Sequence, residues 1–133
     1  MTLIWHRPKP YQEYPKTFGE HLLKRRIESG KTQGQVAFRL SVNEWTYLLW
    51  EKDRTKPMTR YYPALFRFLG YDPFPAPKTL GERLRHKRME LGLSIREAAR
   101  IAGVDEGTFA RWEDGKWRPR SSQKAVQRFL EAK

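Results

Sequence analysis

Basic and hydrogen-bonding side chains gather in one stretch near the C-terminus, which reads TFARWEDGKWRPR from Thr108 to Arg120. Arginine and lysine bind phosphate oxygens, and arginine also binds the O6 and N7 atoms of guanine with two hydrogen bonds. The whole chain of 133 residues has 27 Lys+Arg against 15 Asp+Glu, a net charge of +12. An excess of this size favours a polyanionic partner, with nucleic acid ahead of an anionic membrane.

Other chemistries find little support in the sequence. The absence of cysteine excludes disulfides, thiol catalysis and cysteine-ligated metal sites. The three histidines, His6, His21 and His86, lack metal-site spacing and are expected on the surface. We find no Ser/His/Asp set, phosphate-binding glycine loop or nuclease-type carboxylate cluster, and therefore expect no catalytic residue, cofactor or metal. No apolar run approaches the roughly 18 residues that cross a bilayer, so a cytoplasmic protein without a membrane partner is expected.

An internal repeat organises the chain. The segment KTFGEHLLKRRIESG at Lys16 returns as KTLGERLRHKRMELG at Lys78, and 15 of the 42 pairs aligned at this offset of 62 are identical. Two copies predict a tandem pair of small domains. We expect an N-terminal arm (1–15), a first domain (16–70), a linker (71–77) and a second domain (78–133). Prolines in GYDPFPAPK favour extended backbone in the linker.

Capping motifs predict an all-α fold with four short helices in each repeat. TFGE, TLGE, TQGQ and SIRE are capping boxes, in which a hydroxyl and a Glu or Gln side chain satisfy free backbone amides. Asn43 and Asp105 are N-cap residues of the third helices, while Thr59 and either Ser121 or Ser122 are candidates for the fourth. The predicted helices cover residues 18–29, 33–40, 44–52, 60–69, 80–91, 95–102, 106–114 and 122–131.

Each repeat places an arginine in the apolar stripe of its first helix, Arg26 in one copy and Arg88 in the other. A buried arginine requires a partner. Glu51 and Glu113 each follow the tryptophan of the third helix and lie 25 residues after the arginine. We therefore predict the ion pairs Arg26–Glu51 and Arg88–Glu113, with both tryptophans in the core.

The segment LGLSIREAARIAGVDEGTFARWEDGKWRP (Leu91 to Pro119) resembles the helix-turn-helix of the phage Cro and repressor family of bacterial and phage DNA-binding regulators. The residues that carry the resemblance are Ser94, Glu97, Ala98, Ala99, Gly103, Val104, Trp112, Glu113, Gly115 and Lys116. The segment from Thr32 to Pro57 resembles it more loosely. The resemblance implies two tandem helix-turn-helix domains of the phage-repressor type, double-stranded DNA as partner, and a bacterial or phage-encoded, nucleoid-associated transcriptional regulator.

In that family the second helix lies across the DNA backbone and the third enters the major groove. The base-contact positions that the resemblance implies are Asp105, Glu106, Gly107, Thr108 and Arg111 in the second repeat, and Gln33, Asn43, Glu44, Trp45, Thr46 and Leu49 in the first. The phosphate-contact positions in the following loops are Lys116, Arg118 and Arg120, with Arg54, Lys56 and Arg60 as counterparts.

The first repeat departs from the family at its third helix, where Trp45, Leu48 and Leu49 are expected to form an apolar outer face. One interpretation is contact with thymine methyl groups. The other is a patch that binds a protein or forms a homodimer. The second interpretation supports an alternative function, a protein-interaction module such as an antitoxin or a recombination-directing factor.

Two further segments leave their roles open. Arg7 and Lys9 either contact a minor groove as an N-terminal arm, or their segment packs on the first domain. Trp117 either packs under its loop or contacts sugar. Because the two copies are direct repeats with different base-contact residues, a single chain is expected to favour an asymmetric DNA site, whereas a palindromic site implies a homodimer.

Overall fold

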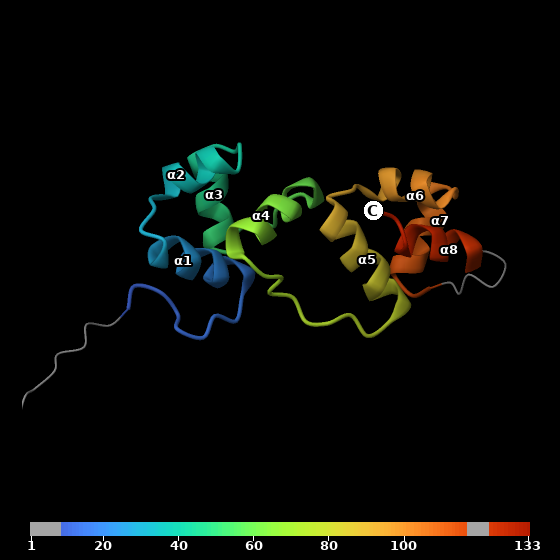
Figure 1. Ribbon diagram of the computed structural model, residues 1–133, viewed down its shortest axis with the longest axis horizontal. Coiled ribbons are helices and arrows are strands. Elements are labelled where there is room, and N and C mark those ends of the chain that lie inside the picture. Colours follow the sequence, from blue (N-terminus) through green and yellow to red (C-terminus); the bar gives the residue numbers. More distant parts are fainter. Residues whose placement is uncertain (1–8, 117–122) are drawn as a thin grey trace, which may run out of the picture. The chain divides into compact units, whose positions relative to one another are not determined.

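The computed structural model describes residues 9–116 and 123–133, which form helices and no strand, so the predicted all-α fold class is confirmed (Figure 1). None of the described helices is both long enough and apolar enough to cross a membrane. In chain order the elements are α1 (Phe18–Glu28), α2 (Gln33–Arg39), α3 (Glu44–Glu51), the 3-10 helix η1 (Thr59–Tyr61), α4 (Tyr62–Leu69), α5 (Leu80–Leu91), α6 (Ile95–Ala102), α7 (Glu106–Glu113) and α8 (Gln123–Leu130).

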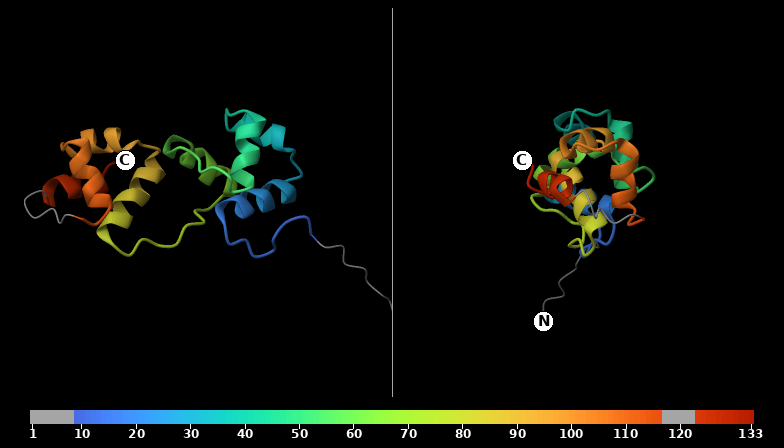
Figure 2. Two further views of the ribbon diagram at one scale, coloured as in Figure 1. Left: turned by 180° about the vertical axis from the view of Figure 1, so that it is seen from behind. Right: turned by 90° about the vertical axis from the view of Figure 1, so that its right-hand side faces the viewer.

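The chain divides into two compact units. Of the described residues, the first unit comprises 9–56 and 68–73, and the second comprises 57–67, 74–116 and 123–133. The division runs within α4. Helices α1–α3 therefore belong to the first unit and α5–α8 to the second, as Figure 2 shows from behind.

The helices begin at the capping residues named above and end within one residue of the predicted ends. Both hydrogen bonds of a capping box are present at the starts of α1, α2, α5 and α6, with Thr17, Thr32, Thr79 and Ser94 as N-caps. The Asn43 side chain accepts from Thr46 N at 2.7 Å, and the Asp105 carboxylate accepts from Thr108 N at 2.6 Å. Local sequence therefore fixes where these helices start in both repeats.

The start of the fourth helix in the first repeat differs from the prediction. Thr59 does not cap a helix with its side chain: η1 begins at Thr59, and Met58, its N-cap residue, makes no side-chain cap. Thr59 Oγ1 instead accepts from Arg88 Nη1 at 3.0 Å, a contact within the second unit. Nearby, a Cβ placed on Gly92 would lie only 2.9 Å from Pro63 Cγ, so residues 57–67 pack closely on the C-terminal end of α5. The Ser121 and Ser122 candidates lie outside the described residues.

Each unit has its own core of aliphatic and aromatic side chains. The core of the first unit contains Leu22, Val36, Ala37, Leu40, Tyr47, Trp50, Phe68 and Leu69, and that of the second contains Leu84, Ala98, Ala99, Ala102, Phe109, Trp112, Val126 and Phe129. Trp50 and Trp112 are 3% and 2% exposed, so the prediction that both are core residues is confirmed. Because these side chains lie on the inner faces of α3 and α7, the opposite faces remain available to a partner.

The first and third helices of each repeat approach closely at a glycine. A Cβ placed on Gly19 would lie 2.6 Å from the Trp50 carbonyl oxygen, and one on Gly81 would lie 2.9 Å from the Trp112 carbonyl oxygen. No side chain fits at such a distance, so glycine allows α1 to meet α3 and α5 to meet α7. Because both units have this close contact at a glycine, their third helices are held by equivalent packing.

Candidate nucleic-acid interface

The ion pair between Arg88 and Glu113 holds α7 against α5. Arg88 Nε donates to Glu113 Oε2 at 2.7 Å, and Arg88 Nη2 donates to Glu113 Oε1 at 3.1 Å. Arg88 Nη1 also donates to the Leu93 carbonyl oxygen at 3.2 Å. The two side chains are 10% and 8% exposed. A buried, bidentate pair of this kind restricts the orientation of both helices.

Arg26 and Glu51 form the equivalent pair in the first unit. Arg26 Nε donates to Glu51 Oε2 at 2.5 Å and Nη2 donates to Oε1 at 3.1 Å. The hydrogen bond to Glu51 raises the pKa of Arg26. Gln33, one of the proposed base-contact residues, is half-buried, and its Nε2 donates to Glu51 Oε1 at 3.2 Å. The amide nitrogen of Gln33 is therefore engaged inside the first unit.

The outer face of α7 carries the candidate base-contact residues of the second unit. Glu106, Gly107 and Arg111 are exposed, and Thr108 is half-buried one turn before Arg111. Hydrogen bonding from the Thr108 backbone amide lowers the pKa of Asp105, so this N-cap carboxylate is ionised at neutral pH. The N-terminal turn of α7 is therefore acidic, and the exposed Arg111 follows it further along the helix.

The loop after α7 is described only at its start. Lys116 is exposed at the end of the described segment. Arg118, Arg120 and the unassigned Trp117 lie outside the described residues. Additional positive charge comes from α6, whose Arg96 and Arg100 are exposed.

The outer face of α3 is less apolar than the sequence predicts. Trp45 is 66% exposed, and Glu44 beside it is also exposed. The prediction that Leu48 and Leu49 share this exposed face is wrong, because both are half-buried, as is Thr46. The helix is short and packs on both α1 and α2, so more than one stripe of its surface is covered. Trp45 remains the exposed apolar group of α3.

Sequence reasoning missed an exposed aromatic residue on α2. Phe38 is 88% exposed, although phenylalanine is usually buried. Its counterpart 62 positions later is Arg100, just as Arg96 and Arg111 stand where the first repeat has Gly34 and Leu49. Aligning the repeats position by position would have revealed this replacement of arginine by an aromatic residue at position 38.

The remaining basic candidates have neighbours of their own. Arg54 and Lys56 are exposed in the first unit. Arg60, in the second unit, donates from Nη2 to the Tyr61 hydroxyl at 2.8 Å and lies over the Tyr61 ring, 4.8 Å from its centroid. Lys9 Nζ lies 3.5 Å from Glu13 Oε1. Arg7 lies outside the described residues.

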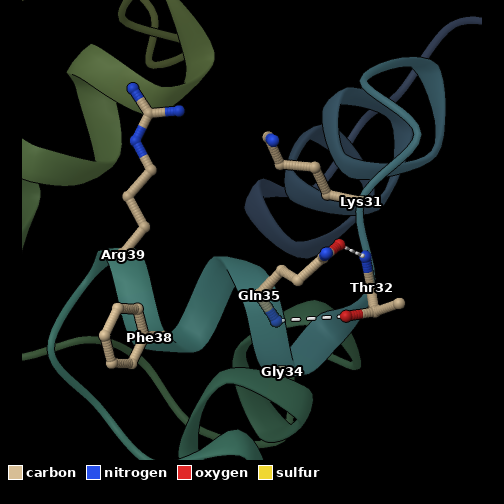
Figure 3. Close-up of a pocket in the computed structure, with 6 residues that line it drawn as sticks. All are labelled: Lys31, Thr32, Gly34, Gln35, Phe38 and Arg39. Atoms are coloured by element: carbon tan, nitrogen blue, oxygen red, sulfur yellow. Dashed lines mark hydrogen bonds between the residues drawn. The ribbon is translucent and has the colours of Figure 1, made fainter.

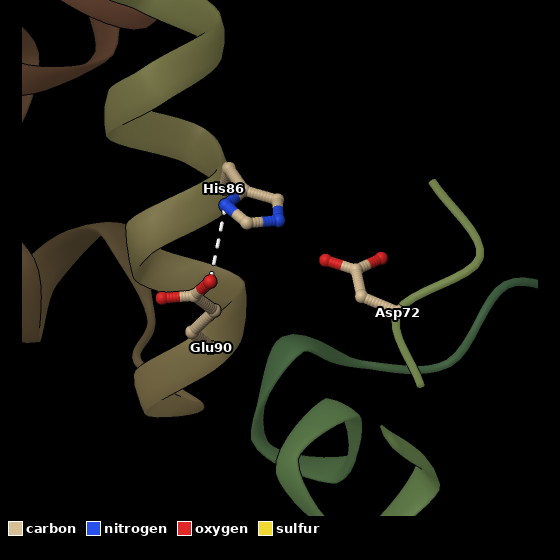
Figure 4. Close-up of side chains that lie close together, drawn as sticks. All are labelled: Asp72, His86 and Glu90. Carbon is tan, nitrogen blue, oxygen red and sulfur yellow. Dashed lines mark ion pairs between the residues drawn. The ribbon is translucent and has the colours of Figure 1, made fainter. Parts of the chain in front are cut away.

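Two of the histidines are more enclosed than expected. His86 is half-buried, and its Nδ1 lies 3.3 Å from Glu90 Oε1 one turn later on α5 (Figure 4). His21 is also half-buried; its Nδ1 lies 2.7 Å from the Tyr71 hydroxyl, and burial lowers its pKa. The prediction of surface histidines is therefore wrong for these two, because the neighbours of α1 and α5 cover part of each ring. His6 lies outside the described residues.

Comparison with known families identifies the second repeat. Residues 79–132 match the family model described as a helix-turn-helix domain, a segment that runs from the N-cap of α5 past the end of α8. Curated proteins gave no match to the chain, and solved structures gave none. This segment of the second repeat is therefore similar to helix-turn-helix domains, a class of domain that binds DNA.

Proposed function

We propose that the protein is a sequence-specific, double-stranded DNA-binding transcriptional regulator of the Cro and repressor type, acting in a bacterial cytoplasm on the nucleoid. The observation that carries the proposal is Arg111, exposed on a helix that the buried pair of Arg88 and Glu113 orients. This geometry occurs within the segment that matches the helix-turn-helix family model.

In this proposal α7 lies in the major groove, which is about 12 Å wide and admits a helix. Arg111 donates two hydrogen bonds to a guanine, while Thr108 and the backbone around Gly107 approach neighbouring bases. Asp105 and Glu106 discriminate against misplaced phosphates and can accept from cytosine. Lys116, Arg118 and Arg120 bind phosphates, which adds affinity without adding sequence information.

The first repeat is proposed to be a second helix-turn-helix domain, spanning 16–70 and joined by residues 71–77 to the second at 78–133. Its candidate base contacts are Asn43, Glu44, Trp45, Thr46 and Leu49 with Gln33, and its phosphate contacts are Arg54, Lys56 and Arg60. The recurrence of capping boxes, close glycine and buried ion pair supports this proposal. Two different domains in direct order favour an asymmetric DNA site.

Selection of bound duplexes from a random pool, using the full chain, tests the proposal. We expect one enriched motif that contains a guanine whose selection disappears in the Arg111→Ala variant. A pool that shows no enrichment, or a motif that Arg111→Ala leaves intact, would contradict DNA reading by α7. Two adjacent motifs would support reading by both repeats.

Exposure of Trp45 favours a second candidate function, a protein-interaction module such as an antitoxin or a recombination-directing factor. A tryptophan of this exposure can anchor a protein interface, including a homodimer. Sedimentation of the full chain and of Trp45→Ala tests the homodimer: a dimer that Trp45→Ala dissociates supports this function. A monomer whose specific DNA affinity falls in Trp45→Ala supports DNA contact by α3 instead.

A further inference from the structure

Phe38 forms one side of an open pocket on the outer surface of α2. The pocket has a volume of about 550 Å³ and lies wholly within the first unit (Figure 3). Its lining residues are Lys31, Thr32, Gly34, Gln35, Phe38 and Arg39. The pocket thus combines an exposed aromatic ring with a concave surface that an inserted side chain can fill.

Positive charge borders this pocket. Among the residues that the structure describes, neither the Lys31 ammonium nor the Arg39 guanidinium has a carboxylate at ion-pair distance. The capping box engages the other polar groups: Thr32 Oγ1 accepts from Gln35 N, and Gln35 Oε1 accepts from Thr32 N, at 3.1 and 2.9 Å. The lining therefore offers two cations and the Gln35 amide nitrogen as donors, and it contains no carboxylate.

The α2 surface differs from the same surface in the second unit in the positions of its cations and in its exposed aromatic ring. Arg96 and Arg100 occupy the positions equivalent to Gly34 and Phe38, whereas Lys31 and Arg39 stand where the second repeat has Leu93 and Ile101. The first unit therefore has an exposed aromatic ring in place of one cation and keeps two cations at other positions. Phe38 gains free energy only by burying its ring against an apolar group, at about 25 cal/mol for each Å² removed from water.

We propose that this α2 surface, formed by Lys31, Gln35, Phe38 and Arg39, docks an acidic segment of a partner protein. A large apolar side chain of the segment packs on Phe38 in the pocket, and its carboxylates pair with Lys31 and Arg39. Aromatic and arginine side chains are the groups that most often carry binding energy at protein interfaces. A second copy of the chain is a poor occupant, because it carries the same net charge of +12 and would bring like charges together.

The inference goes beyond the proposed function and does not depend on it. The α2 surface belongs to the first unit and α7 to the second, so one protein can hold DNA and the partner through different residues. The partner chemistry follows from the pocket alone. DNA binding and peptide binding can therefore fail separately.

Selection from a random peptide library displayed on phage, with the full chain as target, tests the proposal. We expect enriched peptides in which Asp or Glu residues flank a Leu, Phe or Trp. Synthetic peptides of that consensus should lose at least about tenfold in affinity with Phe38→Ser and with Arg39→Glu. Tyr14→Ser is the matched control, because Tyr14 is another exposed aromatic of the first unit, 81% exposed, and should leave the affinity unchanged.

Two outcomes would overturn the proposal. One is a selection whose enriched peptides show no acidic and apolar consensus, or peptides whose affinity is unchanged by Phe38→Ser. The other is a loss of duplex DNA affinity in Phe38→Ser as large as in Arg111→Ala, which would make the α2 surface a nucleic-acid contact. Failure of the unsubstituted chain to bind any duplex would instead contradict the proposed DNA function.

Discussion

The third helix of the first repeat carries Trp45 and Leu49 where that of the second carries Gly107 and Arg111. The features that hold the third helix in place are the same in both repeats: a close-packed glycine, a buried arginine–glutamate pair and a capped helix start. The comparison teaches that the residues that place a helix and the residues that meet a partner are separate sets on opposite sides of it. The framework has been kept in both copies while the outer face has changed.

The two repeats also place their cations at different positions. The second has arginine where the first has Gly34, Phe38 and Leu49, and the first has Lys31 and Arg39 where the second has Leu93 and Ile101. On the third helix the exposed Arg111 stands where the first repeat has the half-buried Leu49. We therefore expect the second unit to supply most of the base recognition.

The largest effect is expected from removing the glutamate of either buried pair. Glu113→Ala leaves Arg88 buried without a counter-charge, which costs about 3–5 kcal/mol of unfolding free energy. Glu51→Ala should cost a similar amount in the first unit, because Glu51 is 7% exposed. Native-state hydrogen exchange reports the two units separately. Glu28→Ala, at an exposed position, is the control. If only one of the two glutamate variants lost stability in its own unit, the two frameworks would not be equivalent.

The next effect concerns DNA affinity. Arg111→Ala should weaken binding to the selected duplex by about 1–3 kcal/mol, roughly fivefold to 150-fold, and relax specificity at one base pair. Leu49→Ala should change affinity by less than about threefold, because a half-buried leucine offers little polar contact. Fluorescence anisotropy with matched duplexes measures both. Equal losses in the two variants would show that both third helices read DNA alike.

A smaller effect is expected from restoring one cation to the first repeat. Gly34→Arg installs the residue found at the equivalent Arg96, and the space around a Cβ there is ordinary. If the first unit lies near DNA, one additional phosphate contact steepens the dependence of log affinity on log salt by about 0.9. Gly34→Gln provides the same gain in helix propensity without charge. An unchanged slope would mean that this end of α2 does not approach phosphate.

The smallest effect is a difference in pH dependence between the capping box of α6 and that of α2. Glu97 accepts from the Ser94 backbone amide in α6, and that hydrogen bond lowers its pKa below the ordinary 4.5. Its ionised form therefore contributes stability above that pH, and the contribution is lost as pH falls through the lowered pKa. Gln35 makes the equivalent bond to Thr32 and does not titrate. Acid should thus reduce amide protection at Ser94 but not at Thr32, and Glu97→Gln should abolish the difference.

Much of the framework could be predicted because its signals are local or repeated. Capping boxes specify helix starts within four residues of sequence, and the helix ends were predicted within one residue. The arginines in the apolar stripes indicated that a partner of opposite charge must lie nearby, since a buried charge requires one. Repetition at an offset of 62 strengthened each inference.

What could not be predicted depends on packing between segments distant in sequence. Leu48 and Leu49 are covered by neighbours on two sides, which helical periodicity alone does not reveal. Thr59 looks like a cap in sequence, yet its hydroxyl meets Arg88, 29 positions later. The exposure of Phe38 contradicts the usual burial of phenylalanine, and only its alignment with Arg100 of the second repeat indicates an outward position.

The packing of residues 57–67 with the second unit has a consequence for synthesis on the ribosome. Tyr62 and Leu65 are buried in the finished protein, and their segment packs near Gly92 and Arg88. At roughly 5–20 residues per second, the segment emerges about 1–5 s before Gly92, which lies 25 positions after Arg67 at the end of α5. During that interval the nascent chain displays an apolar segment before its partner helix α5 is complete, so Tyr62 and Leu65 become buried only after α5 has been synthesised.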